Sequence, residues 1–121
     1  MHVYERSGAT VMARVRGPDG AYITPGMMQT VRYTVFRGSD QQPVDGHEDV
    51  QLDLAAHVFE PLQIDARWRL DPLGYNFRHV LPDTAFTQKG EYRVEYQFIP
   101  QQGARWWSVL RIGARAIWST T

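Results

Sequence analysis

Apolar and polar side chains alternate most regularly between residues 90 and 98. Every second position of this segment is apolar, at Tyr92, Val94, Tyr96 and Phe98. Successive side chains of a β-strand point to opposite faces, so the alternation predicts a half-buried strand with its rings in a core. Gly90 suits a turn before the strand, and Pro100 ends it because proline cannot donate to a strand ladder.

The same two-residue period recurs along the chain. It predicts strands at residues 11–15, 31–35, 75–81 and 106–112, with shorter extended pieces at 21–24 and 66–70. Turn-forming sequences separate these segments, and the clearest is Gly-Pro-Asp-Gly at residues 17–20. About seven short strands with turns between them predict an all-β fold, a single antiparallel β-sandwich.

One segment breaks the period of two. Leu54, Val58 and Leu62 recur every four residues, which is helical spacing, and Asp53 is a suitable N-cap. We therefore expect one short helix near residues 53–62 that crosses between the sheets. Pro61 limits its length, and a pair of strand-like pieces is the alternative.

Length and composition indicate one globular domain. The chain has 121 residues, of which 43% are hydrophobic and 21% charged. A chain of this size buries about two-thirds of its unfolded surface, so its core needs neither a metal nor a disulfide. We expect an N-terminal arm at residues 1–8, a β-sandwich domain at residues 9–113 and a C-terminal tail at residues 114–121.

Charge and cysteine content narrow the classes of partner. The formal net charge is +0, and binding to nucleic acid normally needs a basic excess, so we expect no nucleic-acid partner. The chain has no cysteine, which excludes a disulfide scaffold and a cysteine-based zinc site. Its first residues lack the pattern of a signal peptide, and no apolar run approaches membrane-spanning length. We expect a protein that is made in the cytoplasm without a signal peptide and has no membrane partner. As a component of a particle, it would then be found in the virion.

The segment 86–94 resembles the corner that leads into the F strand of immunoglobulin-like domains. In that family a tyrosine just after a glycine hydrogen-bonds back to the preceding turn. Tyr92 is the matching position, and Val94 stands where the family has its second cysteine. The resemblance implies an immunoglobulin-like β-sandwich and implies no particular function, because such folds carry many functions.

A second resemblance involves three separate segments. Residues 43–46, 58–63 and 74–79 are similar to segments of small uncharacterised proteins from planctomycete and prophage-like genomes. This resemblance implies a phage-type structural accessory protein.

The densest group of metal-ligating residue types lies at residues 45–49, the sequence Asp-Gly-His-Glu-Asp, with Asp53 nearby. Carboxylates and histidine can bind calcium or transition metals, but this spacing matches neither an EF-hand nor an HExxH motif. An exposed acidic loop is the simpler interpretation, so we expect no metal and no cofactor. A small hydrolase or metal enzyme that uses His47, Glu48 and Asp49 is the least favoured hypothesis.

No catalytic motif stands out elsewhere. The serines lack a nucleophile elbow, and no glycine-rich phosphate loop precedes a helix. His79 shares its predicted strand face with Phe77 and Leu81, which indicates a partly buried histidine with satisfied hydrogen bonds rather than a base. We therefore expect that the protein is not an enzyme.

Two adjacent tryptophans mark a candidate contact surface. Neighbouring strand residues point to opposite faces, so Trp106 and Trp107 cannot both enter one core. Arg105 and Arg111 should face water, which places Trp106 inside and leaves Trp107 and Val109 outside together. An exposed tryptophan beside an aliphatic residue favours a contact surface, unless the arm or the tail folds over Trp107.

Apolar residues at both ends of the chain extend this candidate surface. Val3 and Tyr4 lie in the arm, and Ile117 and Trp118 lie in the tail. Short apolar arms of this kind suit packing on the same domain or strand exchange between subunits.

These features favour a non-enzymatic structural or interaction protein, such as a capsid-decoration or tail-attachment subunit of a phage-like particle. Its partner would be another protein, or further copies of the chain in a homo-oligomer. The alternative is a carbohydrate-binding module with Trp107 lying flat beside polar residues such as Gln101 and Gln102. The lack of a signal sequence argues against that alternative.

Overall fold

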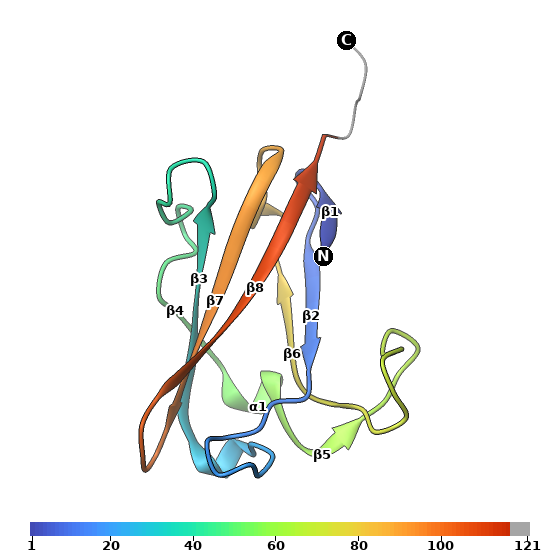
Figure 1. Cartoon of the computed structure of the whole chain (residues 1–121), viewed down its shortest axis with the longest axis vertical. Coiled ribbons are helices and arrows are strands. Elements are labelled where there is room, and N and C mark those ends of the chain that lie inside the picture. The colour runs from blue at the N-terminus through green and yellow to red at the C-terminus, as the bar shows by residue number, and fades with distance from the viewer. Residues whose placement is uncertain (117–121) are drawn as a thin grey trace.

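The alternating segments form two β-sheets that pack face to face. The structure, a computed structural model, describes residues 1–116 of the 121-residue chain (Figure 1). One sheet has five strands in the order β1-β8-β7-β3-β4, and the other has three in the order β2-β6-β5. The predicted all-β sandwich is confirmed, with eight strands in the described residues rather than about seven.

The strands and helices have the following bounds. The five-stranded sheet contains β1 (His2–Tyr4), β8 (Trp106–Arg115), β7 (Gly90–Pro100), β3 (Met28–Arg37) and β4 (Val50–Leu52). The three-stranded sheet contains β2 (Ala9–Ala13), β6 (Tyr75–Leu81) and β5 (Val58–Gln63). The short helices are η1 (Pro25–Met27), α1 (Leu54–His57) and η2 (Asp83–Ala85). Neighbouring strands are antiparallel except β1 and β8, which are parallel.

The core lies between the sheets and follows the predicted alternation. In β7 the even-numbered residues from Tyr92 to Phe98 are all buried, and Val94 has no exposed surface. Their counterparts across the core include Phe77 and Leu81 of β6. Phe77 contacts the rings of Tyr96 and Phe98 edge-on, with centroids 5.1 Å and 5.5 Å apart. These ring contacts fix how the two sheets pack against each other.

The predicted helix at residues 53–62 is wrong in its length. Only Leu54–His57 is helical, and Asp53 stands at the N-cap position without a side-chain capping bond. Residues 58–63 form β5, because Val58 pairs with Phe77 of β6 and buries nearly all of its surface there. The helix does connect the two sheets, as expected, since β4 and β5 belong to different ones.

The predicted extended piece at residues 66–70 is also wrong. Asp65 turns the chain by accepting a hydrogen bond of 2.8 Å from the Arg67 amide. Trp68 is buried in this loop, and its indole Nε1–H donates to the backbone oxygen of Asp71 at 3.1 Å. Its ring packs against Tyr75, with centroids 5.8 Å apart. Local side-chain bonds therefore replace strand pairing in this segment.

β1 lies beside the last residues of β8 at the edge of the five-stranded sheet. Residues 2–4, part of the predicted arm, form β1 and pair with β8 at Gly113, Ala114 and Arg115. β8 therefore extends two residues into the predicted tail, to Arg115. Among the described residues, no helix is long and apolar enough to cross a bilayer.

Tyr92 forms the hydrogen bond that the tyrosine corner implies. Its hydroxyl donates to the backbone oxygen of Gln88 at 2.7 Å and accepts from the Gln88 amide at 3.3 Å. The ring packs edge-on against Phe86, with centroids 5.1 Å apart. This side chain fixes the turn that starts β7.

Candidate functional site

The first half of β8 carries the candidate contact surface. Trp106 turns inward and stacks on Phe98, with ring centroids 5.4 Å apart and an interplanar angle of 12°. Trp107 and Val109 turn outward and remain 55% and 52% exposed. The predicted orientation of both tryptophans is confirmed, and the arm does not cover Trp107.

The backbone of this half-strand has an open side. β8 pairs with β7 along nearly its whole length, from Trp106 to Ala114. On the other side it pairs only with β1, from Gly113 to Arg115. Within residues 1–116, no strand pairs with this side of β8 between Trp106 and Leu110. An unpaired strand side presents amide and carbonyl groups that can accept another strand.

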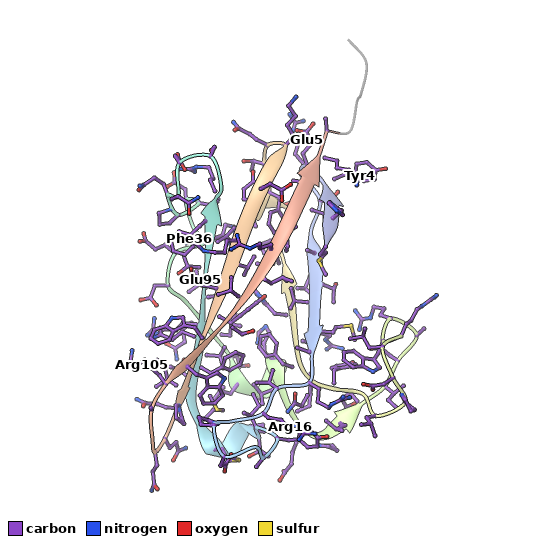
Figure 2. The ribbon with its side chains drawn as sticks, in the orientation of Figure 1. Tyr4, Glu5, Arg16, Phe36, Glu95 and Arg105 are labelled. Carbon is purple, nitrogen blue, oxygen red and sulfur yellow. The ribbon has the colours of Figure 1, made fainter. Side chains whose placement is uncertain are left out.

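Polar groups surround the exposed apolar pair on the outer face. Gln97 lies opposite Trp107, and Glu95 lies opposite Val109. Glu95 accepts a charge-assisted bond of 2.6 Å from Arg93, whose guanidinium also lies 4.6 Å above the ring of Phe36. Figure 2 shows Phe36 and Glu95 in the same region of the outer face. The charges of β7 across from the apolar pair are thus already paired within the sheet, whereas Arg105 and Arg111 flank the pair along β8.

The N-terminal interface candidates lie away from Trp107. Val3 is half-buried and packs against the core, whereas Tyr4 is 60% exposed. Tyr4 pairs with Arg115, eight residues from Trp107 along β8, which is about 26 Å in an extended strand. Figure 2 shows Tyr4 and Arg105 towards opposite ends of the molecule. Ile117 and Trp118 lie outside the described residues. The structure therefore unites Trp107 with Val109 and separates them from Tyr4.

A pocket of about 510 Å³ lies at the end of the sandwich, beside the β7–β8 turn. Trp106, Ile23 and Met28 form its apolar wall, and Gln101 and Gln102 lie at the turn. Trp107 does not line it. The two glutamines predicted to accompany Trp107 in a sugar platform therefore lie with the other tryptophan.

His47 is not part of a ligand group in the acidic loop. Its side chain is buried, with Nδ1 2.8 Å from the Tyr33 hydroxyl and Nε2 2.9 Å from Thr84 Oγ1. Asp49 stays at the surface and pairs with Arg32 at 3.5 Å. Within residues 1–116, no three histidine, aspartate or glutamate side chains are arranged to hold a metal. The grouping of His47 with Glu48 and Asp49 was wrong, because Gly46 and the β3 contact turn the imidazole inward.

The sequence did not predict that histidines and tyrosines meet between the sheets. His79 of β6 hydrogen-bonds through Nδ1 to the Tyr96 hydroxyl of β7 at 2.9 Å. The ring of Tyr33 lies against both imidazoles, with centroids 4.6 Å from His79 and 5.9 Å from His47. These four residues lie far apart in the sequence, so no short sequence motif could have predicted the cluster.

Burial keeps this cluster uncharged near neutral pH. It lowers the pKa of His79 to about 4, with smaller contributions from the nearby His57 and His47 imidazoles. It also lowers the pKa of His47 and raises the pKa values of Tyr33 and Tyr96. Neutral imidazoles with buried hydroxyl partners suit a structural role in joining the sheets.

Comparison with known proteins finds no matching family model, no significantly similar curated protein and no significantly similar solved structure.

Proposed function

We propose that the protein is a non-enzymatic structural subunit that joins a larger assembly through the first half of β8. The observation that carries the proposal is an exposed, uncharged strand segment, Trp106–Leu110, whose backbone is open on one side. Exposed tryptophan beside an aliphatic residue is typical of the centre of protein interfaces. Covering a large apolar side chain contributes about 1.5–3 kcal/mol, and roughly half of that for one already half-buried.

The rest of the fold supports this role. The two sheets are joined by a fully packed core, so the contact strand is held on a rigid support. The charges of Arg93 and Glu95, across from the apolar pair on β7, are paired with each other, so Trp107 and Val109 are the groups there that gain by being covered. The hydrogen bond of Tyr92 supports the proposal that the sandwich is immunoglobulin-like.

The resemblance to planctomycete and prophage-like proteins places the assembly, in this proposal, in a phage-like particle. The chain would then act as a capsid-decoration or tail-attachment subunit, made in the cytoplasm and carried in the virion. Its partner would be a particle protein or further copies of itself, and neither a membrane nor a nucleic acid would be involved.

The test is the solution mass of the protein, measured by light scattering over a range of concentrations. The expected result is a mass above the 14.0 kDa of one chain that rises with concentration. Trp107→Ser should shift the mass back towards 14.0 kDa. Val80→Ser is the matched control, because Val80 is equally exposed (58%) but lies on the other sheet.

Association that Trp107→Ser leaves unchanged would contradict the proposal. A mass of 14.0 kDa at every concentration would exclude further copies as the partner and leave a particle protein. A monomer would shift attention to the pocket beside Trp106, and binding to a glycan array would then favour the carbohydrate-binding alternative.

A further inference from the structure

We propose that β8 pairs antiparallel with β8 of a second copy, across a two-fold axis at Ser108. The two five-stranded sheets would then form one continuous sheet. This inference rests on the proposed function and names the partner and the geometry of its contact.

The hydrogen bonds to β1 show which backbone groups face the open side. The Gly113 amide donates to the Met1 carbonyl at 2.9 Å, and the Arg115 carbonyl accepts from the Glu5 amide at 2.7 Å. The Arg111 carbonyl faces the same way, towards the N-terminal amine at 3.4 Å. Backbone groups alternate sides along a strand, so the amides and carbonyls of Trp107 and Val109 also face the open side. They supply donors and acceptors for a new strand.

The ends of the open stretch determine the register. β8 begins at Trp106, and from Arg111 onward the side is occupied by Met1 and β1. Within the described residues 1–116, five residues therefore remain open on this side, Trp106–Leu110, with Ser108 at their centre. An antiparallel pair centred on Ser108 uses all five residues of both copies. Each β1 then meets the β7–β8 turn of the other copy.

This register makes the two segments complementary to each other. On the outer face, Trp107 lies opposite Val109 of the second copy, and the two-fold axis repeats the pair. On the inner face, Trp106 lies opposite Leu110 in the same way. Ser108, a small residue, faces itself on the axis. Aromatic and aliphatic side chains directly opposite one another stabilise strand pairing. The donors of Trp107 meet the acceptors of Val109, as an antiparallel ladder requires.

The segment lacks the features that protect other sheet edges. β4 is only three residues long, and β5 carries Glu60 and Pro61. The β8 segment has no charge, no proline and no register shift against β7. β2 is also uncharged, but its exposed side carries no aromatic ring. An unprotected edge of this length favours strand addition.

Like charges flank the paired segment, and the two-fold symmetry of the contact limits it to two copies. In the paired register Arg105 lies opposite Arg111 of the second copy, so like charges stand at both ends of the segment. Repulsion between exposed charges weakens as salt screens it, so dimerisation should strengthen with ionic strength. A two-fold contact uses the same surface on both copies, so it closes at a dimer.

The test is disulfide cross-linking through a single introduced cysteine, which is the only thiol because the chain itself has no cysteine. Ser108→Cys would place two thiols on the axis, at a non-hydrogen-bonded pair with Cα atoms about 4.5 Å apart. This spacing lies at the short end of the range for disulfides, about 4.4–6.8 Å. Under mild oxidation we expect a covalent dimer to form at least about ten times faster than for Val80→Cys, because pairing raises the effective thiol concentration.

Two further variants test the register. Val109→Cys should cross-link slowly, because in this register the new cysteine lies opposite Trp107 of the second copy and not opposite another cysteine. Ser108→Lys should raise the dimer dissociation constant about ten-fold or more, because it places two like charges on the axis. Ser108 is exposed, so this change should leave the circular dichroism spectrum and the unfolding midpoint unaltered.

The inference is overturned if Ser108→Cys cross-links no faster than Val80→Cys. It is also overturned if Trp107→Cys cross-links fastest, which would move the axis. Association that depends on Trp107 but gives no Ser108 cross-link would retain the proposed function and reject this pairing. A monomer at every concentration would overturn this pairing and leave a particle protein as the partner in the proposed function.

Discussion

The two halves of β8 differ in their surroundings. In the second half, from Ile112 to Arg115, β1 pairs with Gly113, Ala114 and Arg115 on the side opposite β7, and the inward residues Ile112 and Ala114 are 0% and 6% exposed. The first half is paired with β7 alone, and its inward residues Trp106 and Leu110 are only partly buried. Its outward residues Trp107 and Val109 are more than half exposed. Both halves alternate with a period of two. The difference comes from neighbours, because β1 covers the edge of only one half.

The comparison separates two uses of apolar residues in a strand. In the covered half they hold the fold together, and Gly113 leaves room there for close neighbours. A Cβ at Gly113 would lie 2.8 Å from His2 Nδ1 and 3.1 Å from Glu91 Oε1. In the open half the outward side chains of Trp107 and Val109 add little to the fold and remain available for contact. Substitutions in the two halves should therefore affect different measurements.

The largest effect should come from truncating the covered half. Ile112→Ala should lower the free energy of unfolding by about 2–5 kcal/mol, because it leaves a cavity in the core. Val109→Ala, in the open half, should change it by less than about 0.5 kcal/mol. Denaturant titration of both variants and the unaltered chain measures the two changes in the free energy of unfolding. Equal losses would mean that the two halves do not differ in this way.

Acid should loosen the interior between the sheets. The pKa of His79 falls from 6.5 to about 4 on folding, so the unfolded chain binds the proton more tightly. Stability should be fully present above pH 6.5, fall as the pH drops, and level off for this group near pH 4. At about 1.4 kcal/mol per pH unit, the total loss is about 3 kcal/mol.

The pH window distinguishes this effect from that of carboxyl groups. Burial would raise the pKa of Asp71, but bonds from Arg14 and the Leu73 amide hold it at about 2, so its contribution is lost only below its ordinary pKa of 3.8. His79→Phe should flatten the stability profile between pH 6.5 and 4. An unchanged slope in that variant would exclude His79 as its source.

Detaching β1 should make the covered half resemble the open half. Val3→Asp should cost about 1–2 kcal/mol, because Val3 packs on the core and a carboxylate cannot. The Gly113 amide, which donates to Met1, should then exchange its hydrogen faster. Tyr4→Ser is the control in the same strand and should leave that amide protected, since Tyr4 is exposed.

A smaller loss should follow from removing one hydroxyl in β7, opposite the covered half of β8. Tyr92 lies directly opposite Ile112, and its hydroxyl bonds to Gln88. Tyr92→Phe should lower the free energy of unfolding by about 1 kcal/mol. Tyr4→Phe should have no measurable effect on the same thermal or denaturant curves. A neutral Tyr92→Phe would show that the turn before β7 does not need this bond.

The smallest effect on the fold should come from the residue most important for contact. Trp107→Ser should change the free energy of unfolding by less than about 0.5 kcal/mol, since its ring is 55% exposed. Its effect should appear instead in the solution mass. A large loss of stability would instead assign Trp107 to the fold of its own chain.

The strands and the faces of their side chains could be predicted from the sequence. Side-chain direction in a strand is a local property, so residues 90–98 and the Trp106–Trp107 pair were sufficient to assign inside and outside. The prediction failed where a spacing had two interpretations. Leu54, Val58 and Leu62 match a helix, but Val58 gains more by pairing with β6. In the same way, Asp65 and Asp71 hold a loop around Trp68 where a strand was expected.

Tertiary structure alone determined which of these residues can meet another molecule. The sequence by itself determined the sandwich, the alternation of β8 and the outward direction of Trp107. It did not show that β1 covers only the last residues of β8, or that His47 leaves the acidic loop to join Tyr33 and Thr84. These features depend on pairing between segments far apart in the chain. Such pairing is determined by how the two sheets pack together, and no local pattern of residues encodes it.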